Sequence, residues 1–165
     1  MKDVSGGADA GGLREQFDRL RTGYPSQMSA SLVLPLLQIV QEQKGHVTPA
    51  DAHFVADYAG VPRAQAVEAL SWYTMLHRQP VGRHVVKVCR NIACALRGSD
   101  RLLAHVEKKL GCKAGQSTAD GKFYIKVEEE CLAACCGAPM MMVDHVYYEN
   151  LTPKTVDQIL DAVKE

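Results

Sequence analysis

Hydrophobic residues follow a helical period through the first half of the chain. Leu13, Phe17 and Leu20 recur at intervals of four and three residues, which predicts a short amphipathic helix ending before Gly23 and Pro25. A second helix is predicted from about residue 29 or 31 to 44, or from nearer 34 if Pro35 lies in its first turn. Further helices are predicted at about 48–58 and 62–75, the last carrying Val67, Leu70 and Trp72. Helices joined by such short connections are typical of a small bundle.

Polar and glycine positions mark the ends of these helices. Thr48 is expected to be the N-cap of the third helix, with Pro49 as its first helical residue and Asp51 placed to bond back to the N-cap. Gly45 and Gly60 follow the second and third helices, where a left-handed C-terminal stop is expected.

The pattern changes near Pro80, where β-branched runs replace the helical period. Ser99 is predicted to cap a helix that ends at Gly111, and Thr152 with Pro153 starts a final helix. Strands are predicted at 84–89, 123–127, 139–143 and 146–148, the last two as a hairpin. The chain is predicted to be an α+β protein, with a disordered N-terminus at 1–12, a helical bundle at 13–80 and an α/β domain at 81–165.

Composition narrows the class of protein. The 19 Lys and Arg residues balance the 19 Asp and Glu residues, so a nucleic-acid binder that depends on positive charge is not expected. No apolar run has the length of a bilayer-spanning helix, and the N-terminus lacks the apolar segment of a secretory signal. A cytoplasmic protein without direct membrane insertion is therefore expected. Thiols stay reduced in that compartment, which favours metal or cluster chemistry over disulfides for the six cysteines.

Four of the cysteines form two pairs. Cys89 and Cys94 are separated by four residues in VVKVCRNIAC, at the end of a predicted strand, and Cys131 and Cys135 by three residues in EECLAACCGAPM. If both loops project from the same end of a sheet, the four thiolates meet, as a tetrahedral metal site or an iron–sulfur cluster requires. Cys112 stands alone at a predicted helix end and is expected to be an inert thiol.

The spacing of the pairs excludes several kinds of cysteine site. A plant-type ferredoxin needs a third Cys where Arg97 stands, a Rieske centre needs two His ligands, and a thioredoxin redox motif needs Cys-x2-Cys. None of the histidines lies within either pair, and His105, on a helix with charged neighbours, is expected to be exposed. An all-Cys 2Fe-2S cluster is favoured, and a zinc-stabilised interaction module is the alternative from another class, although zinc knuckles usually have two intervening residues.

Longer stretches of the chain resemble one known family. The chain resembles the thioredoxin-like 2Fe-2S subunit of NADH:quinone oxidoreductase (respiratory complex I), the 24 kDa or E subunit, from about residue 24 to the C-terminus. The paired cysteine motifs followed by GAPM are the most specific part of this resemblance. The matching stretches, in order, are LLQIVQEQKGHVTP, GVPRAQAVEALSWYTM, QPVGRHVVKVC, ALRGSDRLLAHVEKKLG, STADGKFYIKVEEECLAACCGAPMMMV and YYENLTPKTVDQIL.

The resemblance implies a fold, a cofactor and a set of partners. It implies a helical N-terminal region followed by a thioredoxin-like domain that carries one 2Fe-2S cluster. The implied cluster ligands are Cys89, Cys94, Cys131 and Cys135. It also implies an electron-transfer subunit of the respiratory NADH:quinone oxidoreductase, a translocase. The chain itself would be an electron carrier without a substrate site, so no catalytic residue is assigned.

The implied assembly has other subunits that bind the substrate and its cofactor. FMN and NADH are expected on a tightly bound partner subunit, because this chain has no Gly-rich nucleotide-binding motif. Further iron–sulfur subunits are expected in the same complex, with this chain as a peripheral part of a membrane-associated assembly. An NAD-linked hydrogenase or formate dehydrogenase is the alternative host.

Two positions depart from the family's pattern. Cys136 stands where the family usually has Gly, and Trp72 replaces a commoner Phe. We expect Cys136 to be a packed thiol that is not a ligand, and Trp72 to be a tolerated aromatic substitution in the core. The helical region around Tyr24, Trp72 and Tyr73 is the candidate for partner docking.

Overall fold

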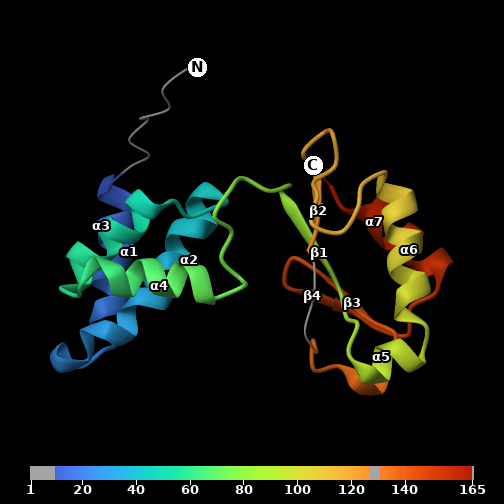
Figure 1. Cartoon of the computed structure of the whole chain (residues 1–165), viewed down its shortest axis with the longest axis horizontal. Coiled ribbons are helices and arrows are strands. Elements are labelled where there is room, and N and C mark those ends of the chain that lie inside the picture. The colour runs from blue at the N-terminus through green and yellow to red at the C-terminus, as the bar shows by residue number, and fades with distance from the viewer. Residues whose placement is uncertain (1–9, 127–130, 165) are drawn as a thin grey trace. The chain divides into compact units, whose positions relative to one another are not determined.

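The computed structural model describes residues 10–126 and 131–164 of the chain. The chain divides into two compact units, Met1–Pro80 and Val81–Glu165, of which the first is helical and the second contains a β-sheet (Figure 1). The predicted α+β class is confirmed. The predicted disorder of residues 1–9 and the predicted strand end at Val127 lie outside the described residues.

The first unit consists of helices around one hydrophobic core. Its elements are α1 (Ala10–Arg21), a 3-10 helix (Ser26–Leu32), α2 (Val33–Lys44), α3 (Pro49–Ala59) and α4 (Arg63–Trp72). Residues 10–12 were expected to be disordered but belong to α1, because Leu13 and Phe17 are buried in the core and hold the first turns of the helix.

The start of α3 and the C-terminal ends of α2 and α3 have the predicted capping residues. Thr48 Oγ1 accepts a hydrogen bond from the Asp51 N–H at 3.2 Å, and the Asp51 carboxylate accepts one from the Thr48 N–H at 2.9 Å. Together these bonds form a capping box, with Pro49 at the first helical position. Gly45 and Gly60 end the two helices in the left-handed region, with φ of 76° and 70°. These predicted helix boundaries are confirmed.

Trp72 lies on the surface, so the expectation that it packs in the core is wrong. α4 ends at Trp72 and does not continue to residue 75, and its buried residues are Ala66 and Leu70, which lie one turn apart. Trp72 follows Leu70 by two residues, which places it about 200° around the helix from that buried stripe. The Trp72 side chain is accordingly 76% exposed.

The second unit is built on a sheet with the strand order β2-β1-β3-β4 among the described residues. β1 and β2 are parallel and are joined by a crossover through α5 and α6, whereas β3 pairs antiparallel with both β1 and β4. The elements are β1 (His84–Val88), α5 (Ile92–Leu96), α6 (Ser99–Leu110), β2 (Phe123–Ile125), a 3-10 turn (Cys135–Gly137), β3 (Met141–Val143), β4 (Val146–Tyr148) and α7 (Pro153–Ala162). The predicted hairpin is thus β3–β4.

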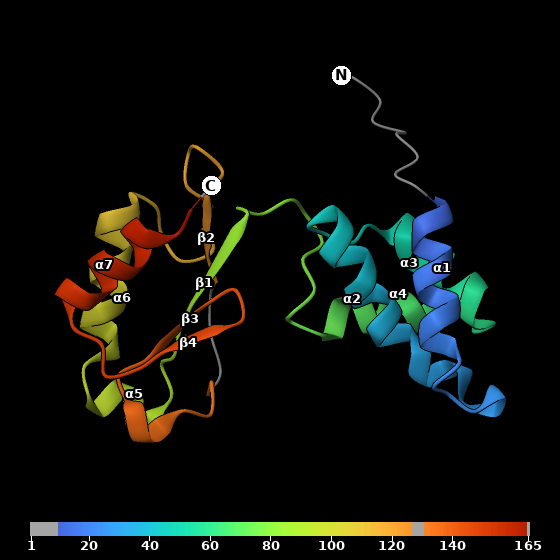
Figure 2. The same ribbon diagram turned by 180° about the vertical axis from the view of Figure 1, so that it is seen from behind.

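The helices α6 and α7 lie side by side on one face of this sheet (Figure 1, Figure 2). Val106 of α6 and Val156 of α7 are fully buried against strand residues that include Val86, Ile125 and Met141. The paired cysteines lie outside this core, in the segments that follow β1 and precede β3. No helix within residues 10–126 and 131–164 is both long and apolar enough to cross a membrane.

The start of α6 differs from the prediction. Ser99 was expected to be the N-cap, but Gly98 takes that position with φ of 90°, and Ser99 is already helical and fully buried. Glycine adopts this left-handed conformation without a steric cost, so the chain turns into α6 one residue earlier than the serine suggests. The short helix α5, between the first cysteine pair and α6, was not predicted either.

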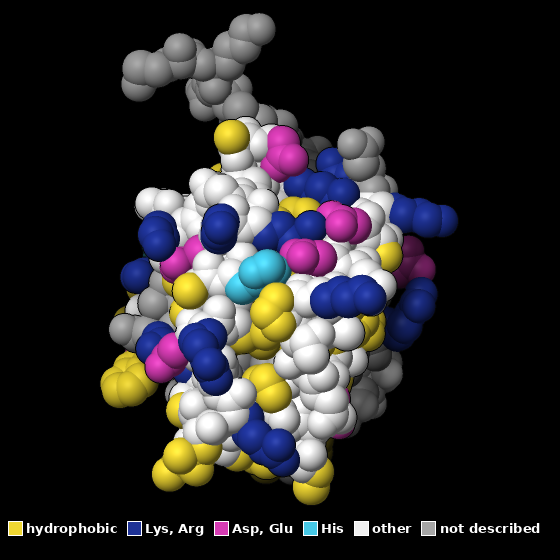
Figure 3. All heavy atoms as spheres, turned by 90° about the vertical axis from the view of Figure 1, so that its right-hand side faces the viewer, with side chains coloured by type: hydrophobic (Ala, Val, Ile, Leu, Met, Phe, Trp, Pro, Cys, Tyr) yellow, Lys and Arg dark blue, Asp and Glu magenta, His cyan; other side chains and the backbone are white. Residues whose placement is uncertain are grey.

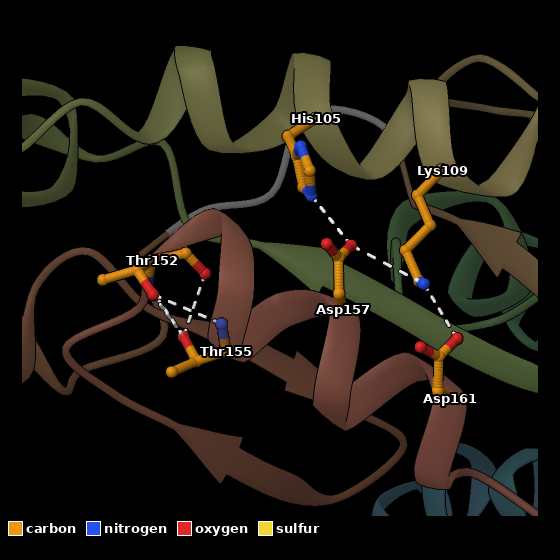
Figure 4. A network of polar contacts seen from close by, with 6 residues as sticks. All are labelled: His105, Lys109, Thr152, Thr155, Asp157 and Asp161. Carbon is orange, nitrogen blue, oxygen red and sulfur yellow. Dashed lines mark hydrogen bonds and ion pairs between the residues drawn. The ribbon is translucent and has the colours of Figure 1, made fainter.

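A polar network joins α6 to α7 on their outer side (Figure 4). His105 Nε2 and Lys109 Nζ of α6 lie 2.8 Å and 3.6 Å from Asp157 Oδ1, and Lys109 Nζ lies 2.8 Å from Asp161 Oδ1. The His105 side chain is 29% exposed. It was expected to be exposed, and it is instead half-buried because α7 packs alongside it.

Stability in mild acid should depend on Asp157. The hydrogen bond from His105, followed by the charges of His105 and Lys109, lowers the pKa of the Asp157 carboxyl below its usual value. A carboxyl whose pKa is lower in the folded state stabilises the fold at pH values above its unfolded-state pKa of about 3.9. This stabilisation is lost as the pH falls through the folded-state pKa. The thermal midpoint of the chain should therefore fall between about pH 5 and pH 3, and Asp157→Asn should flatten part of that fall. Parallel slopes for variant and wild type in circular dichroism melts would contradict this.

Candidate metal centre

The end of β1 and the helix α5 position the first cysteine pair. Cys89 directly follows β1, and its N–H donates to the Met140 carbonyl at 3.2 Å, which ties it to the segment entering β3. The Asn91 side chain accepts a hydrogen bond from the Ile92 N–H at 2.9 Å and so starts α5, which carries Cys94. Both thiols are buried, with exposures of 2% for Cys89 and 1% for Cys94.

The second pair lies on an exposed loop that ends in a 3-10 turn. Cys131 and Cys135 are exposed, and their Sγ atoms lie 3.6 Å apart. Ala133 lies between them with φ of 63°, and its N–H donates to the Cys131 sulfur at 3.3 Å. The left-handed residue therefore folds the loop back so that a backbone amide faces a thiol.

The two pairs meet at one end of the sheet. The register of β1 and β3 places the first pair beside the residues that enter β3. The Cys89 thiol interacts with those of both Cys94 and Cys131, and Cys94 also interacts electrostatically with Cys135. The structure thus brings the four predicted ligand side chains together. No three His, Cys, Asp or Glu side chains of the described residues form a group with the geometry of a single bound ion.

The thiols differ in how readily they lose a proton. Burial raises the pKa of Cys94 to about 11, with Cys89 and Cys135 adding to the effect and the Met140 N–H opposing it. The Ala133 N–H, followed by the hydrogen bond with Cys135, lowers the pKa of Cys131. The hydrogen bond and charge of Cys131 in turn raise the pKa of Cys135. Of these three thiols Cys131 is the one most easily held as a thiolate, and a bound metal must displace the proton of Cys94.

This donor set fits an iron–sulfur cluster. Two thiolates on one tetrahedral ion with metal–sulfur bonds of about 2.3 Å lie about 3.8 Å apart, close to the separation of the second pair. Thiolates select iron–sulfur clusters or zinc over hard cations. Backbone N–H donors from Ala133 and Met140 face the sulfurs of Cys131 and Cys94, as the outer shell of a cluster requires. Sequence reasoning missed the Met140 amide, because only the sheet register places it there.

Of the other two cysteines, Cys112 lies away from this arrangement in sequence, whereas Cys136 directly follows Cys135 on the same turn. Cys112 is half-buried, and its thiol lies 3.8 Å from the Gln116 carbonyl oxygen. Burial raises its pKa, in keeping with an inert thiol. Cys136 is exposed, so the expectation of a packed thiol is wrong. It lies in the 3-10 turn Cys135–Gly137 at the surface, and its distance in sequence from Cys131 equals that between Cys89 and Cys94.

Cluster retention should be sensitive to the backbone at Ala133. Its φ of 63° is unfavourable for any residue with a Cβ and more so for a β-branched residue, by roughly 1–2 kcal/mol. Ala133→Val is expected to lose iron and sulfide faster in air than the wild type, whereas Ala133→Gly retains them. The Ala133 side chain is exposed, so any difference reflects the backbone and not packing. Equal bleaching rates at the cluster's visible absorption for the two variants would contradict the assignment.

The fold and the site together define the class of protein. A sheet with parallel β1 and β2 and two helices on one face makes a thioredoxin-like domain (Figure 1), and the four thiols gathered beyond β1 give it a site of four cysteines. The model of the family described as "Thioredoxin-like [2Fe-2S] ferredoxin" matches residues 17–164. The chain belongs to this family, and the resemblance drawn from its sequence is confirmed.

Several relatives match over most of their length. The chain is 39% identical over 142 residues to the E subunit of the NADH-quinone oxidoreductase of Rickettsia bellii, a match that covers 86% of this chain and 84% of the relative. It is 35% identical over 151 residues to the E subunit of the same enzyme from Escherichia coli, covering 92% and 89%. It is 36% identical to "NADH dehydrogenase [ubiquinone] flavoprotein 2, mitochondrial" of Dictyostelium discoideum, covering 90% of this chain and 60% of that protein.

A solved structure shares the fold. A chain of an NAD+-reducing [NiFe]-hydrogenase in the air-oxidized state matches with a TM-score of 0.58 at 16% identity. The match covers 91% of this chain and 22% of that chain, so this protein spans about a fifth of the hydrogenase polypeptide. At this identity the likeness concerns the fold alone.

Proposed function

We propose that this protein is the electron-transfer subunit of the NADH dehydrogenase module of a respiratory NADH:quinone oxidoreductase. Its role is to exchange single electrons between the flavin of a partner subunit and its own 2Fe-2S cluster. The observation that carries the proposal is the convergence of the two cysteine pairs, whose sulfurs interact at one end of the sheet. Relatives of nearly the same length, named as the E subunit of that enzyme, support it.

Cys89, Cys94, Cys131 and Cys135 would hold the cluster, which supplies reversible one-electron chemistry when bound. The chain's own contribution is electrostatic. The buried pair Cys89 and Cys94 keeps water from one side, and the N–H groups of Ala133 and Met140 stabilise charge on the sulfurs. The exposed pair leaves the opposite side at the surface, where a redox partner has access.

Substrate chemistry belongs to other subunits in this proposal. The sequence contains no Gly-rich phosphate-binding motif, so NADH and FMN bind the partner, which forms a tight heterodimer with this chain. The assembly includes further iron–sulfur subunits and lies at the cytoplasmic surface of a membrane, with this chain as a peripheral part.

Anaerobic co-purification with the flavin-binding subunit tests the proposal. Addition of NADH should bleach the visible absorption of the cluster and produce a rhombic electron paramagnetic resonance signal, with about two irons and two acid-labile sulfides per chain. A colourless chain with about one zinc would make this a structural module and overturn the electron-transfer role. Absence of NADH-driven reduction in the intact complex would overturn it as well.

The identity of the host complex has a second candidate. The fold is shared with part of an NAD+-reducing hydrogenase, so a diaphorase subunit of a hydrogenase or formate dehydrogenase is the alternative. Relatives named for the quinone-linked enzyme, at 35–39% identity, favour the respiratory host. Identifying the co-purified subunits by mass spectrometry separates the two: nickel- or molybdenum-binding subunits would favour the alternative.

A further inference from the structure

The segment between β4 and α7 runs along the 3-10 turn of the second cysteine pair. The Asn150 N–H donates to the Gly137 carbonyl at 2.6 Å, and the Leu151 N–H donates to the Pro139 carbonyl at 2.9 Å. The turn itself is closed by a hydrogen bond from the Gly137 N–H to the Ala134 carbonyl at 3.0 Å. These backbone bonds fix the residues just before α7 beside the second cysteine pair.

The side chain of Glu149, the first residue of this segment, packs directly on Gly137. A Cβ added to Gly137 would lie 2.5 Å from both Cβ and Cδ of Glu149, far inside van der Waals contact. Rotation about the side-chain bonds of the glutamate moves its carboxyl group but leaves its Cβ in place. The collision would therefore be relieved only by a movement of the backbone of residues 149–151 away from the turn. Glycine at position 137 is what allows the carboxyl group to approach the turn this closely.

This contact places a negative charge beside the cysteine turn. Gly137 is two residues from Cys135 in a 3-10 turn, which rises about 2 Å per residue, so the Glu149 carboxylate lies on the order of 10 Å from the Cys135 sulfur. That distance is about the Debye length in 0.1 M salt, so the charge is only partly screened. Within residues 10–126 and 131–164, no Lys, Arg or His forms an ion pair with this carboxylate.

We propose that the Glu149 carboxylate lowers the reduction potential of the 2Fe-2S cluster, an inference that rests on the proposed function. Reduction transfers one electron from the partner's flavin, and with it one negative charge, to a centre that already has four thiolate ligands. A fixed carboxylate nearby makes that added charge less favourable, because the potential of such a cluster depends on the net charge around it. Glu149 thus shifts the electron equilibrium toward the flavin of the partner subunit.

Removal of the charge alone, by Glu149→Gln, tests the inference. The full chain, purified anaerobically with its cluster, would be titrated with dithionite and redox mediators, and the reduced fraction followed by visible absorption and electron paramagnetic resonance. At the wild-type midpoint potential, the ratio of reduced to oxidised cluster should rise about threefold in Glu149→Gln, an upward shift of about 30 mV at about 59 mV per tenfold change. Glu149→Asp keeps the charge and should stay within about 1.5-fold of the wild type.

Asp161→Asn is the matched control, because it removes one negative charge from the same unit. Asp161 lies in the last turn of α7, whereas Glu149 precedes its start, and the 10 residues of α7 span about 15 Å. Acidic and basic side chains are intermingled on the α6–α7 side of the second unit (Figure 3), and Lys109 Nζ lies 2.8 Å from Asp161 Oδ1. The control should leave the ratio of reduced to oxidised cluster within about 1.5-fold of the wild type.

Salt separates an effect of charge from an effect of shape. In about 1 M salt the screening length falls to about 3 Å, so the difference between Glu149→Gln and the wild type should shrink. A difference that salt leaves unchanged would contradict the proposal, as would equal shifts in Glu149→Gln and Glu149→Asp. Should Glu149→Gln lose iron, Glu149→Ala also removes the charge and gives the same comparison.

The outcomes also separate this inference from the proposed function. If the wild type holds the cluster but Glu149→Gln shifts its potential no more than Asp161→Asn does, the inference is overturned and the proposed function stands. If the wild type holds zinc or no metal, both are overturned.

Discussion

Replacement of Cys135 by serine is expected to abolish the cluster, whereas replacement of the adjacent Cys136 is expected to leave it intact. Cys135 Sγ lies 3.6 Å from Cys131 Sγ and interacts with the buried pair, while Cys136 is an exposed thiol on the same turn. A serine hydroxyl does not ionise near neutral pH, so it cannot replace the thiolate. Iron and acid-labile sulfide in Cys135→Ser should fall below about one tenth of the wild-type content.

Cys136→Ser is the matched control for this experiment, since it makes the same chemical change one residue away. Its visible and electron paramagnetic resonance spectra should match those of the wild type. If Cys136→Ser loses the cluster and Cys135→Ser keeps it, the ligand set is Cys89, Cys94, Cys131 and Cys136. If each single variant retains a cluster and only the double variant loses it, the two thiols substitute for one another.

The second large effect concerns the core of the helical unit. Phe17 is fully buried, and its ring centroid lies 5.9 Å from that of Phe54 and 5.1 Å from that of Tyr58. Phe17→Ala removes these contacts and leaves a cavity, so the free energy of unfolding should fall by about 3–5 kcal/mol. Urea unfolding followed by far-ultraviolet circular dichroism measures the change.

Trp72→Ala serves as the comparison for Phe17→Ala. It also deletes a large aromatic side chain, but one that is 76% exposed, so the change in unfolding free energy should stay within about 0.5 kcal/mol. Comparable destabilisation by the two substitutions would place Trp72 in a core and contradict its position on α4. The emission of Trp72, the single tryptophan, should also change little on unfolding.

Local chemistry in the sequence was sufficient for most helix boundaries. The Thr48, Pro49 and Asp51 combination, and glycines after α2 and α3, act through hydrogen bonds within a few residues of each end. The capping box at Thr152 and Thr155 starts α7 in the same way. Such signals do not depend on what packs against the helix, and they can be read without knowing the fold.

Other features could not be predicted because they depend on packing. Trp72 was placed in the core and His105 at the surface, yet α4 turns Trp72 outward and α7 half-covers His105. The aromatic or charged character of a side chain indicates which environments suit it, but not which neighbouring elements pack against it. Ser99 was likewise expected to cap α6, whereas the backbone at Gly98 starts the helix.

The same division holds for the site. The cysteine pairs could be read from the sequence, because four thiols in two pairs at short spacings are typical of metal or cluster ligation, and the motifs around them indicated the family. The burial of Cys89 and Cys94, the exposure of Cys131 and Cys135, and the position of the Met140 amide toward Cys94 all depend on the tertiary structure. The spacing of cysteines along the chain determines which thiols can bind the same metal ion. Burial and the hydrogen-bond donors of the site arise from strand register and helix packing between residues far apart in sequence.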